Sequence, residues 1–324
     1  LKERLQEQKH EIRGEISEKE EQLRDEVTEL AAQLKAEISE EVGAQVRAEV
    51  AKQVQSALLA MDTDIENRAW LAKVLEGRVL RGAPGEAELP DSPSAGTGLN
   101  YFVFEDQFRG SREEIKERQR AFVRYFEGCS NVLDIGCGRG EFLELMRDEG
   151  IGARGVDLDE TMVEFCRSRG LAVELNDAVS YLEQLEDESL DGVFIDQVVE
   201  HLEPAYLVRL LELCYRKMKF GYHIVAETVN PLSFVSFANF YIDMTHVRPV
   251  HPETLRFLFG AAGFREIEAQ FSAPVPDEAR LRKLSLDGNS DGSKREFIQI
   301  YNQNIDLLNG ILYGAQDYAA VGRK

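Results

Sequence analysis

Three glycines at alternate positions follow a short apolar segment near the middle of this 324-residue chain. The segment ends in Asp134, and Gly136, Gly138 and Gly140 precede a stretch with helical periodicity. Glycine lets the backbone approach a ligand closely, and a helix N-terminus beside it favours polar ligand groups. A dinucleotide site has the spacing GxGxxG, whereas the spacing here is GxGxG, and Asp134 would repel a pyrophosphate. Its carboxylate suits instead the ammonium group of an amino-acid moiety.

The region around this loop alternates short apolar segments with amphipathic stretches. Alternation at this length predicts an α/β fold, with a parallel sheet that carries helices on both faces. Strands are predicted at residues 131–135, 153–157, 172–175, 190–195, 222–227, 264–271 and 316–322. Helices are predicted at residues 111–127, 141–149, 159–169, 178–185, 204–217 and 252–261.

Acidic or amide side chains stand at the ends of the next two predicted strands. Asp157 ends the second strand about twenty residues after the glycines, where a carboxylate can accept both ribose hydroxyls, and Leu158 can pack on adenine. The third strand ends in Asn176, Asp177 and Ala178, where the Asp177 side chain can accept from the adenine amino group. A helix N-cap would explain Asp177 alone, but it does not explain three successive strand ends.

Residues 129–200 resemble the class I, Rossmann-like methyltransferases, whose first motif reads like VLDIGCGxG. The resemblance implies an S-adenosylmethionine-dependent enzyme with a seven-stranded sheet, whose last strand is antiparallel and inserted beside the sixth. It implies that the glycine loop holds the methionine part of S-adenosylmethionine, that Asp157 holds the ribose, and that Asp177 and Ala178 hold the adenine. The cofactor-binding residues expected are Asp134, Gly136, Cys137, Gly138, Gly140, Asp157, Leu158, Asn176, Asp177, Ala178, Gln197 and Arg109.

The segment after the fourth strand bears on the methyl acceptor. Members of this class that methylate the amine nitrogen of bases or glutamine carry an (N/D)PP(Y/F) motif there, and its absence favours oxygen methylation. Residues 101–111, 230–232, 246–252, 307–309 and 317–319 resemble methyltransferases of bacterial surface-polysaccharide clusters. That narrower resemblance implies a lipid-linked glycan acceptor such as O-antigen, methylated on a terminal sugar hydroxyl or a phosphate, so that the chain is capped. A small-molecule oxygen methyltransferase and a cofactor-binding scaffold are the alternatives.

A sugar hydroxyl is protonated at neutral pH, so a general base should assist its methylation. His201 is the first candidate, with Glu200 beside it and His246 from a later insertion. Each histidine has an equally simple structural interpretation, and Arg109 is either a carboxylate clamp or a surface residue. Asp196, Glu227, Asp243 and His246 could bind Mg²⁺, but no ligand spacing enforces it, and we expect no metal. Phe234, Phe237, Phe240 and Tyr241 fit either a sugar-stacking wall or core packing.

Residues 1–81 are charged and helical in pattern, with an apolar stripe too narrow for a globular core. They predict a long N-terminal coiled coil that makes a homo-oligomer or a spacer toward a partner glycosyltransferase. Residues 82–98 are rich in Pro, Gly and Ser and predict a linker, and residues 99–324 form the predicted methyltransferase domain. The chain opens at Leu1 in mid-pattern, which suggests a fragment of a longer protein.

Composition limits the partners and the compartment. The net charge of −21 repels phosphate backbones, so nucleic acid is not an expected substrate. The cysteines have no CxxC spacing and predict reduced, buried thiols. Because neither a membrane-spanning run nor a signal peptide is visible, we expect a cytoplasmic protein, with any place at the inner membrane provided by partners. The cysteines are Cys129, Cys137, Cys166 and Cys214.

Overall fold

The structure is a computed structural model that describes residues 18–19, 22, 24–25, 101–285 and 292–324. The described residues among the first hundred are helical. The coiled coil predicted for residues 1–81 otherwise lies outside the described residues, as does the linker predicted for 82–98, so both stay predictions.

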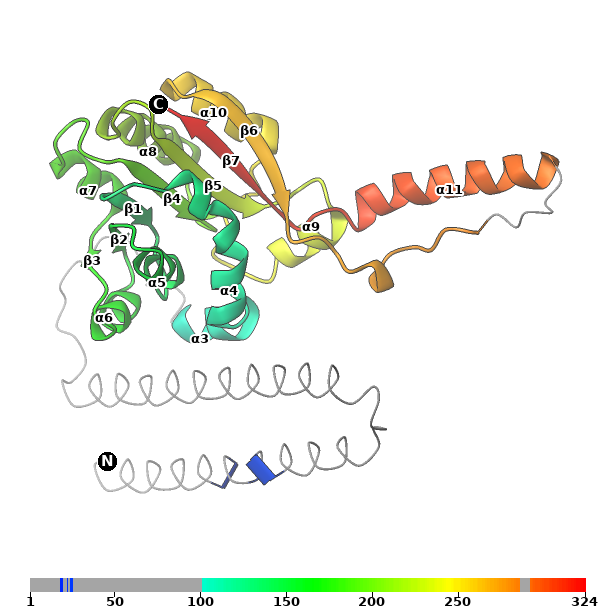
Figure 1. Ribbon diagram of the computed structural model, residues 1–324, viewed down its shortest axis with the longest axis horizontal. Helices are drawn as coiled ribbons and strands as arrows, with labels where there is room; N and C mark the ends of the chain where they lie inside the picture. The colour runs from blue at the N-terminus through cyan, green and yellow to red at the C-terminus, as the bar shows by residue number, and fades with distance from the viewer. Residues whose placement is uncertain (1–17, 20–21, 23, 26–100, 286–291) are drawn as a thin grey trace. The chain divides into compact units, whose positions relative to one another are not determined.

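The described part of the chain forms one seven-stranded sheet in the order β3-β2-β1-β4-β5-β7-β6 (Figure 1). β1 to β5 are parallel neighbours, and β7 is antiparallel to both strands that flank it. This arrangement confirms the predicted Rossmann-like sheet with its inserted last strand. The strands are β1 (Val132–Ile135), β2 (Ala153–Asp157), β3 (Val173–Leu175), β4 (Gly192–Asp196), β5 (His223–Val229), β6 (Arg265–Ser272) and β7 (Asp317–Arg323).

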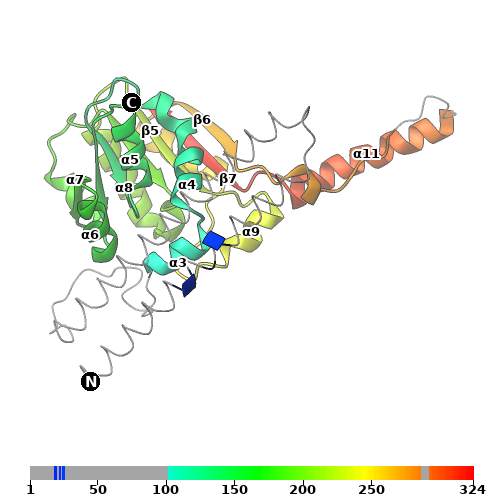
Figure 2. The same cartoon turned by 60° about the horizontal axis from the view of Figure 1, so that its bottom comes forward.

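Helices cover both faces of the sheet because successive side chains of each strand point to opposite sides. Val193 and Ile195 of β4 pack with α7, α8 and α10, whereas Phe194 between them packs with η1 and α5 (Figures 1 and 2). α6 contacts β2 and β3 at one edge. These elements are η1 (Arg120–Tyr125), α5 (Glu141–Asp148), α6 (Glu160–Ser168), α7 (Ala178–Gln184), α8 (Pro204–Lys217) and α10 (Pro252–Ala262).

Local sequence signals set where several helices begin. α4 (Arg112–Gln119) starts at a capping box, in which the Ser111 hydroxyl accepts from Glu114 N and the Glu114 carboxylate accepts from Ser111 N. Proline occupies the first turn of α8 and α10. The single helix predicted at 111–127 is wrong in detail, since α4 ends at Gln119 and the chain continues as the 3₁₀ segment η1.

Other helices were not predicted. α3 (Tyr101–Phe108) and α9 (Phe234–Phe240) lie at the same end of the sheet (Figure 2). α11 (Gly292–Leu312) contacts α9, and two short 3₁₀ segments complete the described elements, η2 (Val199–His201) and η3 (Asp277–Ala279).

Two expectations from composition have structural outcomes. All four cysteines are buried and free, as predicted. Among the described residues, every helix is too short or too polar to cross a membrane.

Candidate active site

The glycine loop after β1 has a backbone that only glycine takes easily. Gly136, Gly138 and Gly140 have φ values of 68°, 50° and 76°. A Cβ added at Gly136 would lie 2.5 Å from Val198 Cγ2, and one at Gly140 would lie 2.6 Å from Leu171 Cδ1. The first and last glycines therefore let the loop pack closely against Val198 and Leu171, which explains why the loop needs glycine at these positions.

Asp157, at the end of β2, is held beside the loop by backbone donors. Its Oδ2 accepts from Gly138 N at 2.9 Å, and its Oδ1 accepts from Asp159 N at 2.8 Å. Burial raises the pKa of Asp157 to about 6, although these hydrogen bonds lower it. Each carboxylate oxygen keeps a lone pair, so the fixed carboxylate can accept two vicinal hydroxyls, as predicted for a ribose.

A cavity of about 150 Å³ lies over the ends of β1, β2 and β4. Apolar side chains from Leu158, Met162 and Leu202 form much of its wall and suit an adenine ring. The glycine loop, the Asp157 carboxylate and the apolar wall of this cavity thus fit S-adenosylmethionine. The predicted cofactor residues that line this cavity are Gly136, Gly138, Asp157, Leu158, Asn176, Ala178, Gln197 and Arg109.

The other predicted cofactor residues do not line this cavity. Asp134 is 3% exposed, and burial with the nearby charge of Asp196 raises its pKa well above the ordinary range. Cys137 and Gly140 pack against Cys166 and residues below the loop. The Asp177 carboxylate accepts from Ser180 N and from the Tyr206 hydroxyl, so it caps α7. The helix-cap interpretation of Asp177 is the one that the contacts support.

A second cavity, of about 310 Å³, adjoins the first. α3, α4, β4, β5, α9 and β7 contribute to its wall, together with Ile242, Asp243 and His246. Its wall is rich in polar side chains, among them Glu105, Gln119, Asn239 and Gln316. The residues that line both cavities are Glu105, Arg109, Asp196, Gln197 and His201.

Asp196, the last residue of β4, stands in this shared wall. Its Oδ2 accepts from the Arg109 guanidinium and from Gln119 Nε2, both at 2.7 Å. Its Oδ1 is buried and accepts from no amide, guanidinium or hydroxyl group of the described residues, and the carboxyl of Glu227 lies beside Asp196. The sequence prediction treated Asp196 only as a metal candidate, although a carboxylate at the end of the central strand was a usable signal. Arg109 is engaged by Asp196 and Glu105, and it is therefore not an ordinary surface residue.

Burial dominates the ionisation of the carboxyl groups around Asp196. It raises the pKa of Glu227 well above the ordinary range, with the charges of Asp196 and Asp317 adding to the effect. It also raises the pKa of Asp317 to about 6 and that of Glu105 to about 7. A cavity lined by these carboxyl groups and by Asp196 favours hydrogen-bond donors in its ligand.

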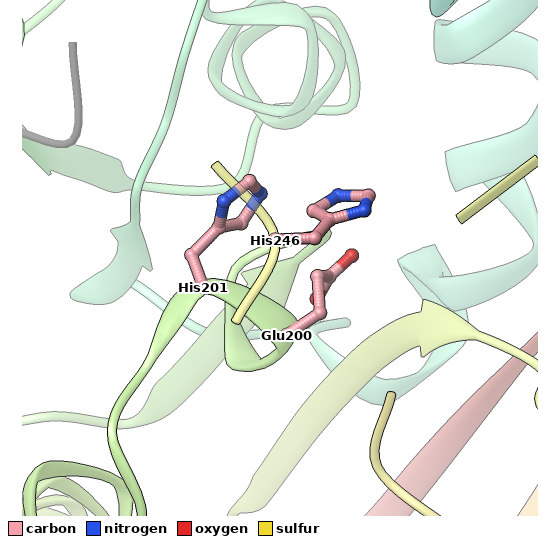
Figure 3. A group of neighbouring side chains, drawn as sticks. All are labelled: Glu200, His201 and His246. Carbon is pink, nitrogen blue, oxygen red and sulfur yellow. The ribbon is translucent and has the colours of Figure 1, made fainter. Parts of the chain in front are cut away.

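The three residues predicted to be catalytic come together. Glu200 and His201 lie in η2, and His246 lies in the loop after α9 (Figure 3). The two imidazole rings meet edge to face with centroids 4.6 Å apart. Burial lowers the pKa of His201 to about 4 and also lowers that of His246, whereas it raises that of Glu200 to about 8. Both imidazoles are therefore neutral at pH 7.

The aromatic residues predicted for a sugar-stacking wall differ in their exposure. Phe240 is buried and its ring packs on His246, whereas Phe234 and Tyr241 are exposed. His251 is not part of the group formed by Glu200, His201 and His246. Its Nδ1 accepts from Glu253 N, so its side chain caps α10.

A seven-stranded Rossmann-like sheet with a glycine loop, an acidic second-strand end and an adjoining polar cavity defines a methyltransferase fold and site. Residues 116–218 match the family described as methionine biosynthesis protein MetW. The crystal structure of an S-adenosylmethionine-dependent methyltransferase from Archaeoglobus fulgidus is 49% identical in sequence. It covers 70% of this chain and 100% of that one, with a TM-score of 0.67.

Curated relatives point the same way. A probable S-adenosylmethionine-dependent methyltransferase of Mycolicibacterium smegmatis is 30% identical over 189 residues, which cover 58% of this chain and 70% of that protein. A probable S-adenosylmethionine-dependent methyltransferase of Mycobacterium tuberculosis is 30% identical over 154 residues, or 47% of this chain and 56% of that protein. The ubiquinone biosynthesis O-methyltransferase of Alkalilimnicola ehrlichii is 30% identical over 105 residues, which cover 31% of this chain and 41% of that protein.

This chain belongs to the S-adenosylmethionine-dependent methyltransferases, and S-adenosylmethionine is the cofactor of that family. The chain spans 56% of the length of the M. tuberculosis relative and 41% of the ubiquinone enzyme.

Proposed function

We propose that this protein methylates a hydroxyl oxygen of a glycan, and specifically a terminal sugar of a lipid-linked bacterial surface polysaccharide such as O-antigen. The observation that carries the proposal is the wall shared by the two cavities, which brings one acceptor-sized polar cavity against the cofactor cavity. A methyl donor in one and a hydroxyl in the other would meet at Asp196 and His201.

The lining of the acceptor cavity supports a hydroxyl-rich ligand. Carboxylate, amide and guanidinium groups surround it, and such groups need hydrogen-bond partners when a ligand excludes water. Sugar hydroxyls supply both donors and acceptors. A quinone ring would leave many of these groups without partners, which disfavours the small-molecule alternative despite the similarity to ubiquinone O-methyltransferases.

The bound cofactor supplies a methyl group to an in-line displacement, and the protein contributes alignment of the acceptor oxygen. Asp196 Oδ1 accepts a hydrogen bond from the acceptor hydroxyl and takes its proton as the oxygen–carbon bond forms and the sulfur–carbon bond breaks. Arg109 and Gln119 fix the other carboxylate oxygen, so Asp196 cannot turn away. His201, predicted as the base, lies in the same wall, where Asp196 takes the role of proton acceptor.

The partners follow from the same proposal. Methylation of the terminal hydroxyl removes the site at which a glycosyltransferase would add the next sugar, so the chain would be capped. Residues 1–81 would assemble the subunits or space them from that glycosyltransferase, which remains a prediction.

The test is incubation of the full chain with radiolabelled S-adenosylmethionine and a panel of lipid-linked oligosaccharides and catechols. Label in a glycan supports the proposal. Label in a catechol and in no glycan overturns it. A scaffold without turnover is the explanation if S-adenosylhomocysteine binds and no acceptor is labelled. If Asp196→Asn and His201→Ala both keep full glycan activity, the acceptor is a phosphate, which needs no base.

A further inference from the structure

Glu200, His201 and His246 place three potential metal ligands around one point (Figure 3). One ligand atom of each residue lies within 4.8 Å of the other two, and this is the one such group found among the described residues. Glu200 and His201 are adjacent in η2, while His246 is brought from the loop after α9. The juxtaposition is therefore made by tertiary structure and not by a sequence motif.

The hydrogen bonds of the two imidazoles fix which nitrogen carries the proton. His246 Nδ1 lies 2.6 Å from the carbonyl oxygen of Phe240, which can only accept, so Nδ1 is protonated. The Thr245 hydroxyl donates to Asp243 Oδ1 at 2.7 Å, so its oxygen accepts from His201 Nδ1 at 3.0 Å. In both rings Nε2 then carries the lone pair. Metal-binding histidines are characteristically held in this way, by donation of the other N–H to a carbonyl or an oriented oxygen.

Glu200 supplies a buried carboxyl oxygen that lacks a hydrogen-bond partner among the described residues. Its side chain is 0% exposed, and its Oε2 accepts from Thr228 Oγ1 at 2.8 Å. Its Oε1 is buried and has no hydrogen-bond partner among the described residues. A buried carboxyl oxygen without a partner is costly, and a bound cation, which would take the place of the carboxyl proton, would remove that cost.

We propose that Glu200, His201 and His246 bind one divalent transition-metal ion through Oε1, Nε2 and Nε2. Two imidazoles and one carboxylate suit Zn²⁺ and its neighbours better than Mg²⁺, which prefers oxygen ligands alone. Both histidines line the acceptor cavity. The remaining coordination positions therefore face that cavity, the layout of a catalytic rather than a structural site.

One consequence rests on the proposed function. An acceptor hydroxyl that coordinates the ion would lose its proton to Asp196 more readily, because a bound divalent metal acidifies oxygen ligands. The metal site itself needs no turnover, so binding and activity can be tested separately.

The experiment is a calorimetric titration of the chelator-treated full chain with Zn²⁺, with bound zinc counted by elemental analysis after dialysis. Co²⁺ in place of Zn²⁺ gives a visible absorption band that reports the coordination. We expect one ion per chain, and we expect His246→Asn to weaken binding by at least about tenfold. His251→Asn is the matched control, because His251 lies outside the cluster and asparagine preserves its cap on α10. Glu200→Gln removes the carboxylate ligand, and we expect it to weaken metal binding as well.

Two results would overturn the metal site. One is the absence of a bound ion in the wild-type chain, and the other is equal affinity in His246→Asn and His251→Asn. Titration of each variant with S-adenosylhomocysteine shows that the domain is folded, so a lost metal site is not confused with unfolding. A chain that binds one ion but methylates no glycan would contradict the proposed function and leave the metal site intact.

Discussion

Asp196 is the residue on which the proposed chemistry depends most directly. Arg109 and Gln119 anchor one of its oxygens, and the other is buried at the wall shared by the two cavities. Asn at this position keeps one oxygen to accept from the anchors but cannot take a proton. We expect Asp196→Asn to lower kcat by about 10²–10⁴ in steady-state assays. The affinity for S-adenosylhomocysteine should change little, and a variant with wild-type kcat would exclude Asp196 as the proton acceptor.

The ionisation of Asp157 sets how cofactor affinity should depend on pH. Its pKa is about 6 in the free protein, and the ionised carboxylate is the form that accepts ribose hydroxyls. Below pH 6 the cofactor must displace a proton, so affinity should fall by about tenfold per pH unit. Calorimetry with S-adenosylhomocysteine between pH 5 and pH 8 measures this, and Asp157→Asn should bind weakly at every pH. A flat profile in the wild type would show that the ribose is held elsewhere.

At the scale of elements, α4 shows how a local signal positions part of the acceptor cavity. The capping box of Ser111 and Glu114 starts the helix that carries Ile115 and Gln119 into the cavity wall. We expect Ser111→Ala to lower the free energy of unfolding by about 1 kcal/mol, because a backbone N–H loses its acceptor. Urea denaturation measures it. Ser111→Thr keeps the hydroxyl and should stay near the wild type, so equal losses in both variants would contradict the capping role.

The strands and most helices were predictable because their signals are local. Each predicted strand overlaps an observed one, since β-branched and apolar runs bounded by turns mark strands. α9 was missed because its aromatic residues fit a lid or the core equally well, and α11 was missed as well. The cofactor loop was predictable for the same local reason. The Arg109–Asp196 contact was not, because 87 residues separate the partners.

At the scale of the whole molecule, buried carboxyl groups set the pH dependence of stability. Burial raises the pKa of Glu105 to about 7 and those of Asp157 and Asp317 to about 6. The folded protein therefore holds these protons more tightly than the unfolded chain. The stabilisation is present at low pH and is lost as pH rises through the folded pKa values.

We expect the free energy of unfolding of the cofactor-free protein to fall by roughly 2–5 kcal/mol between pH 5 and pH 8. The net charge of −21 acts in the same direction through self-repulsion. Urea titrations at several pH values measure the trend, and Glu105→Gln should reduce its slope. Stability that rises over this range would contradict the burial of these groups.

A cofactor cavity at the ends of β1 and β2 meets a separate acceptor cavity at Asp196. Calorimetric titration of the full chain with S-adenosylhomocysteine, for wild type and Asp196→Asn side by side, tests it most directly. We expect one molecule bound per chain, with affinities of the two proteins within a few-fold of each other. No heat of binding to the wild type, or loss of binding on the Asp196 substitution alone, would contradict it.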